Sequence, residues 1–127
     1  MLRTLLAGVF LAHGIAHVVG FVVPWRIVTS AEVPYRTTVL GTDVGPIAVR
    51  ALGIAWLIVA CLFVALAASV FRHAVWWNVR TLLLVGLSVV LCVLGLPEAR
   101  PGLLANAAIL ALLALGWALS IYPDMHV

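Results

Sequence analysis

Four long runs of apolar residues dominate the pattern of this chain, and shorter polar segments separate them. The runs cover about residues 5–23, 51–71, 76–96 and 103–121. Each is close to the length of about 20 residues that an α-helix needs to cross the hydrocarbon core of a bilayer. Strands of a membrane barrel would alternate apolar and polar residues, and these runs are continuous instead. The pattern predicts an all-α fold, a four-helix transmembrane bundle that forms a single domain over residues 1–127.

The polar segment 24–46 is a long loop between helices 1 and 2 of this bundle. Its three prolines and two glycines argue against a regular helix. It also carries apolar side chains, among them Val33, Val39 and Leu40, so we expect it to pack back over the bundle. A loop of this length in a compact protein is uncommon and is often functional.

The composition agrees with a lipid environment. Hydrophobic residues make up 66% of the chain and charged residues only 9%, too few to cover the surface of a soluble domain. The net charge of +3 comes from arginines that are scattered along the chain without a cluster. Because nucleic-acid binding usually needs a basic patch or stripe, the sequence predicts membrane lipid and no nucleic acid as a partner.

An even number of spans places both termini on the same side of the membrane. That side would carry three arginines and the other side four, so the arginine count does not decide the orientation. Arg3 precedes the first span, and the turn at 72–80 is basic without acidic residues. These two features favour N- and C-termini in the cytoplasm.

His13 and His17 are the most informative residues of the first span. They are four positions apart, so they lie on one helix face. Ionisable side chains are costly near mid-membrane, so we expect both to face the bundle interior. Three interpretations remain: neutral histidines bonded across helices, a transition-metal or haem site, or a site for a small ligand. Histidines at this spacing can bind a metal, although Gly14 stands where a zinc-protease helix carries glutamate.

Small residues repeat every four positions beside the histidines, at Gly8, Ala12, Ala16 and Gly20. Such a ridge lets two helix backbones approach closely. We therefore expect the ridge to pack the first helix into the bundle.

The third span has its own stripe, formed by Thr81, Val85, Ser88, Cys92 and Gly95. Their spacing of four, three, four and three residues follows one helix face. It is the least apolar face of this span, so it is expected to point inward. Cys92, like Cys61, lies within an apolar run, and we expect both cysteines to be free thiols.

The directions of the helices bring several polar residues to the half of the bilayer beneath the 24–46 loop. Asn106 lies near the start of the fourth span, where its amide needs a partner that hydrocarbon cannot provide. We predict a polar cluster, either structural or ligand-binding, of His13, His17, Ser88, Asn106 and Asp43.

Catalytic motifs are not evident. The sequence shows no glycine-rich phosphate loop, no plausible Ser-His-acid set and no paired membrane carboxylates. Enzymatic activity is left open, and a non-enzymatic role is favoured: an accessory subunit or binding module with a polar interior around the His pair. The alternatives are a metal- or haem-binding protein that uses His13 and His17, and a small-ligand binding or transport pocket under the loop. A larger membrane complex or a second copy of the chain are the expected protein partners.

Several short motifs resemble those of a family of small bacterial four-helix integral membrane proteins without assigned activity. They are the HGIAHVVGF run at 13–21, which fits a pattern HGxxHxxGF, the pair Trp76-Trp77, and Glu98-Ala99-Arg100 followed by Gly102 and Ala105-Asn106. The resemblance implies the same four-helix fold, the bacterial cytoplasmic membrane, and His13, His17 and Asn106 as typical positions. It implies no activity.

Overall fold

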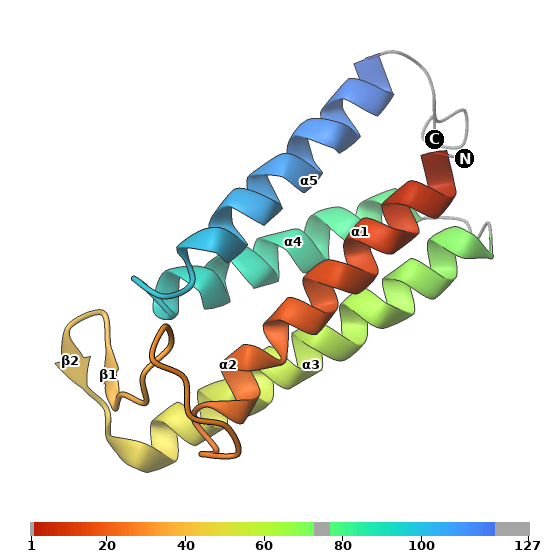
Figure 1. Cartoon of the computed structure of the whole chain (residues 1–127). Coiled ribbons are helices and arrows are strands. Elements are labelled where there is room, and N and C mark those ends of the chain that lie inside the picture. The colour runs from red at the N-terminus through yellow and green to blue at the C-terminus, as the bar shows by residue number, and fades with distance from the viewer. Residues whose placement is uncertain (1, 73–76, 119–127) are drawn as a thin grey trace.

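The computed structural model describes residues 2–72 and 77–118, and within them the chain is mainly helical (Figure 1). Its elements are α1 (Leu2–His17), α2 (Val19–Val22), β1 (Thr38–Val39), β2 (Thr42–Asp43), α3 (Gly45–Phe71), α4 (Trp77–Leu94) and α5 (Arg100–Ala118). Four helical segments in the described part are long and apolar enough to cross a membrane: Thr4–Val22, Gly45–Phe71, Trp77–Leu94 and Arg100–Ala118. The predicted all-α class with four spans is confirmed, and the long loop joins the first two.

Two helices begin earlier than the sequence suggested. α3 starts at Gly45 instead of near residue 51, and α5 starts at Arg100 instead of near 103. In both cases a proline, Pro46 or Pro101, stands in the first turn. Proline is tolerated there because its missing N–H has no intrahelical partner in any case. α4 ends at Leu94, and the expected ends of the third and fourth spans at Trp76 and at 119–121 lie outside the described residues.

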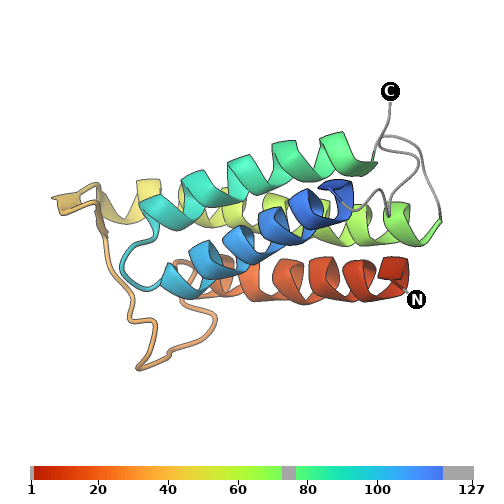
Figure 2. The same cartoon turned by 90° about the horizontal axis from the view of Figure 1, so that it is seen from above.

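The helices pack in the order α1, α3, α4 and α5, with α1 running antiparallel along α3 (Figures 1 and 2). Their shared core is mainly apolar, and its fully buried residues include Phe10, Phe63, Val59, Val70 and Val85. The outer surface is also apolar, with Leu5, Ile15, Ile54, Leu83 and Leu104 all exposed. An apolar exterior around an apolar core is stable only in lipid, so this is a multi-pass membrane protein.

The first span is interrupted at Val18, between α1 and α2. The Val18 N–H bonds the Ile15 carbonyl at 3.0 Å, three residues back, which tightens the turn there. At the same point His17 donates its Nδ1–H to the His13 carbonyl at 3.0 Å. This side-chain bond to the carbonyl four residues back coincides with the end of α1.

The packing face of α1 differs from the expected one. Gly8, Ala12 and Ala16 are exposed, and only Gly20 of that ridge packs, against the indole of Trp56. Close approach to α3 occurs at Gly14, where an added Cβ would lie 2.9 Å from Phe63 Cβ and 3.0 Å from the Ala60 carbonyl oxygen. The expectation for the ridge is therefore wrong at three of its four positions. The face that buries the histidines turns Gly8 and Ala12 outward, and Ala16 lines the cavity instead of packing against another helix.

The 24–46 loop lies at the end of the bundle where α3 begins (Figure 1), and its residues Val33, Val39 and Leu40 line a cavity there. Trp25 donates its indole N–H to the Arg50 carbonyl at 3.2 Å, which ties the start of the loop to α3. Further along, β1 and β2 form a short antiparallel hairpin whose turn residues, Leu40 and Gly41, both have positive φ. Positive φ at both central residues is what a two-residue type I′ hairpin turn requires.

Candidate functional site: a buried polar cluster and a cavity

Four polar side chains from three helices meet inside the bundle. His13 and His17 come from α1, Ser88 from α4 and Asn106 from α5, and all four are between 0% and 6% exposed. Ser88 is the centre of this polar cluster. Its Oγ lies 2.8 Å from His17 Nε2, 2.8 Å from Asn106 Nδ2 and 3.3 Å from His13 Nε2. His13 Nε2 also lies 3.1 Å from Asn106 Oδ1. The structure thus brings together four of the five residues expected in the cluster.

The hydrogen-bond partners fix the direction of each bond when both imidazoles are neutral. A carbonyl oxygen only accepts, so His17 carries its proton on Nδ1 and its Nε2 accepts from the Ser88 hydroxyl. Ser88 Oγ in turn accepts from the Asn106 amide N–H. The Asn106 oxygen accepts from His13, whose proton is therefore on Nε2. The cluster is a directed chain that runs from His13 through Asn106 and Ser88 to His17.

Aromatic and small neighbours hold the two imidazoles in place. The His13 ring stands edge-on to Phe63 at a centroid distance of 4.7 Å, and the His17 ring lies 5.0 Å from that of Trp56. On α4, the residues Thr81, Val85, Ser88 and Cys92 are all buried, so the expected inward stripe of this helix is confirmed. Gly102 makes room for this stripe, since an added Cβ there would lie 2.7 Å from Cys92 Sγ.

Asp43 does not belong to the polar cluster, and this corrects the sequence interpretation. It is exposed on β2, and its Oδ1 accepts the Gly45 N–H at 3.0 Å. Hydrogen bonds from the Thr37 side chain and from Gly45 lower the pKa of its carboxyl group. Asp43 thus stabilises the start of α3, where unpaired N–H groups and the positive end of the helix dipole favour a carboxylate.

The Nε2 atoms of both histidines, one route by which they could share a metal, are directed at a protein group. The two Nε2 atoms converge on the Ser88 hydroxyl, and His17 Nδ1 faces a carbonyl. Across the described ranges, no three His, Cys, Asp or Glu side chains are grouped so that they could hold a metal ion. Both cysteines are free, as predicted, with Cys61 exposed and Cys92 buried. The metal and haem hypotheses remain predictions, and this geometry gives them no support.

The contact between Ser88 and His17 also resembles a nucleophile and its base. Activation of a serine hydroxyl requires that the hydroxyl reach a substrate. Ser88 is 0% exposed, and its oxygen already accepts a hydrogen bond from Asn106. The arrangement therefore suits a structural hydrogen-bond chain rather than nucleophilic catalysis.

A cavity of about 540 Å³ adjoins the cluster beneath the 24–46 loop. His13, His17 and Cys92 line its inner end within the bundle. Its other walls come from the loop, from α3 and from the turn between α4 and α5, and they are mainly apolar, including Val23, Val33, Val39, Leu52, Trp56 and Leu96. This volume falls within the range of roughly 300–1,000 Å³ that is usual for small-molecule sites.

Trp56 is a central cavity residue that the sequence pattern did not single out. It lies inside α3, and its indole fits against two glycines, Gly20 and Gly95. An added Cβ would lie 2.3 Å from Trp56 Cδ2 at Gly20 and 3.0 Å from Cζ2 at Gly95. A tryptophan in the middle of an apolar span, away from the interface where this residue is favoured, was the available signal.

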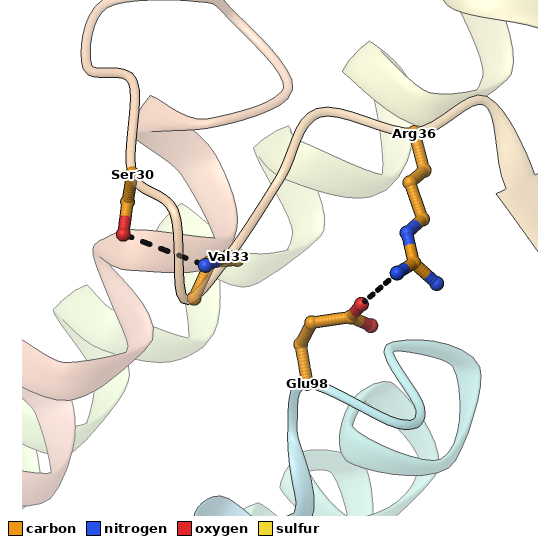
Figure 3. A network of polar contacts seen from close by, with 4 residues as sticks. All are labelled: Ser30, Val33, Arg36 and Glu98. Atoms are coloured by element: carbon orange, nitrogen blue, oxygen red, sulfur yellow. Dashed lines mark hydrogen bonds and ion pairs between the residues drawn. The ribbon is translucent and has the colours of Figure 1, made fainter.

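An ion pair joins the two sides of the outer end of the cavity. Arg36 in the loop contacts Glu98 in the turn between α4 and α5, with 3.0 Å between Nη2 and Oε1 (Figure 3). In the same loop the Val33 N–H bonds Ser30 Oγ at 3.4 Å, next to the cavity wall (Figure 3). The side chains of Arg36 and Glu98 are 51% and 17% exposed, so solvent screens this pair. Its effect is to orient the loop over the cavity rather than to provide much stability.

Fold and site together define a class: a four-helix integral membrane protein with a buried His-Ser-Asn cluster at the inner end of a loop-covered cavity. Comparison of the chain with protein-family models, with curated proteins and with solved structures found no match.

Proposed function

We propose that this protein binds a small, mainly apolar molecule in the cavity beneath the 24–46 loop. The single observation that carries the proposal is the cavity itself, which has apolar walls and a polar inner end. Ligand sites in proteins are typically concave and apolar, with a few placed polar groups that orient the ligand. The binding-module interpretation of the sequence and the pocket interpretation thus converge on one site.

The polar cluster alone would not support this proposal, because its members satisfy one another. No fully buried side-chain nitrogen or oxygen of the described residues lacks a hydrogen-bond partner. The cavity is different. Close packing drives helix association in lipid, and a ligand that lies in the cavity makes dispersion contacts of the same kind with its mainly apolar walls.

Filling the cavity with a side chain provides the test. Val33 lines the cavity and Val28 lies in the same loop outside it, so Val33→Trp and the control Val28→Trp form a matched pair. The proteins are purified in mild detergent and extracted with organic solvent, and the extracts are compared by mass spectrometry. We expect a compound in near-stoichiometric amount from the wild type and from Val28→Trp, and its loss from Val33→Trp. The same compounds in all three extracts would contradict the proposal.

The metal and haem alternatives are tested on the same preparation. Protein from metal- and haem-replete cells is analysed for bound metal and for visible absorption. We expect neither a stoichiometric metal nor a Soret band, because the Ser88 hydroxyl occupies the point where the two Nε2 atoms converge. A metal or a Soret band that disappears in His17→Leu would replace the ligand proposal by the metal one.

For the location, we propose the bacterial cytoplasmic membrane with both termini in the cytoplasm. The start of α1 and the end of α5 lie at the same end of the bundle, opposite the loop (Figure 1). The loop and the turn after α4 mix arginines with Glu32, Asp43 and Glu98, whereas Arg72 and Arg80 at the other end stand without acidic neighbours in the sequence. Reporter fusions at both termini test this orientation, and periplasmic activity of either fusion would contradict it.

A further inference from the structure

The direction of the hydrogen-bond chain leaves one acceptor unused. His13 donates from Nε2 to Asn106, so the Nδ1 atom of the neutral ring carries a lone pair and no proton. Among the described residues no side chain or backbone group bonds this Nδ1 atom. Because fully buried polar side-chain atoms here all have partners, this nitrogen is not sealed in the core. His13 itself lines the cavity.

A donor is available on the cavity wall as well. The indole of Trp56 lies beside the His17 ring, which in turn lies 4.5 Å from the His13 ring between centroids. The Trp56 N–H makes no hydrogen bond to another described residue, and Trp56 lines the cavity. The residues that line the inner cavity therefore include one unused acceptor on His13, one unused donor on Trp56 and three aromatic rings, those of His13, His17 and Trp56.

The charges around the cavity cancel. Arg36 and Glu98 are the two charged side chains that line it, and they are paired with each other. A charged ligand would meet no uncompensated partner, and a charge near the histidines would lie among apolar walls, where it is costly. The lining consequently favours an uncharged ligand.

We infer that the cavity selects an uncharged lipophilic molecule with a hydroxyl group, and that this hydroxyl donates its hydrogen bond to Nδ1 of His13. The inference rests on the proposed function and adds the chemical class of the ligand. A hydroxyl fits because it donates one hydrogen bond and accepts others through its oxygen, while the apolar body of the molecule packs against Trp56 and the valines of the loop.

Three naphthalene probes test the inference: 2-naphthol, 2-methoxynaphthalene, which lacks the donor, and anionic 2-naphthoate. Binding to the full chain in nanodiscs is measured by equilibrium dialysis. Binding to Val33→Trp in identical nanodiscs is subtracted, which removes partition into lipid. We expect 2-naphthol to bind about fivefold more tightly than 2-methoxynaphthalene, the effect of one neutral hydrogen bond, and 2-naphthoate to show no specific binding. In His13→Phe, with helicity checked by circular dichroism, the preference for 2-naphthol should disappear.

Two outcomes overturn the inference. Equal specific binding of 2-naphthol and 2-methoxynaphthalene would show that the hydroxyl plays no role. Tighter specific binding of 2-naphthoate than of 2-naphthol would show that the ligand need not be uncharged. Both would leave the cavity a binding site. Failure of the proposed function would instead appear in the extraction experiment, as identical extracts from wild type, Val33→Trp and Val28→Trp. The two failures are therefore distinguishable.

Discussion

One face of α1 is buried and another is exposed, although each contains a glycine. One face buries Leu6, Phe10, His13, Gly14 and His17 against the rest of the bundle. The other carries Gly8, Ala12 and Ala16 at regular four-residue spacing and is exposed. Both faces contain a glycine, but only Gly14 lies against a neighbouring backbone. Regular spacing of small residues therefore did not identify the packing face here.

The histidines explain the difference. Turning the small-residue ridge toward α3 would move the imidazoles toward lipid, where polar groups find no hydrogen-bond partners. In the observed orientation both rings reach Ser88, and His13 also reaches Asn106. The need for hydrogen-bond partners for two imidazoles thus outweighs the packing advantage of a smooth ridge. On the face that carries the histidines, Gly14 allows the close approach of α1 to α3.

The largest expected effect is that of a methyl group on the buried face. In Gly14→Ala the new Cβ meets Phe63 Cβ and the Ala60 oxygen at 3.0 Å or less, so α1 and α3 must move apart. Overpacking of this kind costs roughly 1–3 kcal/mol. We expect Gly14→Ala to lower the free energy of unfolding by that amount, measured by titration with denaturing detergent and followed by circular dichroism.

Gly8→Ala is the matched control on the exposed face, because nothing lies within 4 Å of an added Cβ at this position. This variant should be neutral or slightly stabilising, since alanine favours helix over glycine by up to about 1 kcal/mol. Equal losses of stability in the two variants would show that the distinction between the faces is false.

An intermediate effect is expected from the hub of the polar cluster. Ser88→Ala removes the hydroxyl that contacts both imidazoles and the Asn106 amide. Hydrogen bonds between membrane helices average about 0.6 kcal/mol and reach about 1.7 kcal/mol, so a loss of roughly 1–2 kcal/mol in unfolding free energy is expected. Ser69→Ala serves as control, since Ser69 is half-buried and its hydrogen bond, to the Ala65 carbonyl, stays within its own helix. A smaller loss in Ser88→Ala than in Ser69→Ala would mean that the cluster does not hold α1 to the bundle.

The sequence predicted the spans and most of the polar cluster because both follow from periodicity and length. Apolar runs of membrane length specify helices directly. The positions of His17, Ser88 and Asn106 relative to the loop follow from the alternating directions of the spans. Polar residues that lie at a similar depth on inward helix faces have few hydrogen-bond partners other than one another. His17, Ser88 and Asn106 therefore meet, as the directions of their helices implied.

The remaining features depend on packing between elements that are distant in the sequence. Asp43 forms hydrogen bonds within its own loop and with the start of α3 instead of with the polar cluster. The sequence alone could not decide between these local partners and His17. The cavity arises where the loop, α3 and the turn before α5 fail to fill the space around Trp56, and no single segment encodes that volume. The exposure of the small-residue ridge likewise depends on which face of α1 packs against the other helices. The spacing of residues within α1 does not determine which face that is.

The smallest change in stability is expected from a substitution on the exposed face of α1. It is the most direct test of the difference between the buried and exposed faces of this helix. Ala12 is exposed and, unlike Ala16, does not line the cavity. In Ala12→Leu the larger side chain extends into lipid, which solvates leucine as well as the bundle interior does. Exposed substitutions away from special features usually change stability by less than about 0.5 kcal/mol, and we expect that result in the same detergent titration, with an unchanged oligomeric state by cross-linking in nanodiscs. Leucine at Gly14, in contrast, should prevent the close contact with α3. If Ala12→Leu instead lowers stability or dissociates a dimer, the ridge packs against a second copy of the chain. The exposed face of α1 is then a dimer interface in which the small residues allow two helix backbones to approach closely.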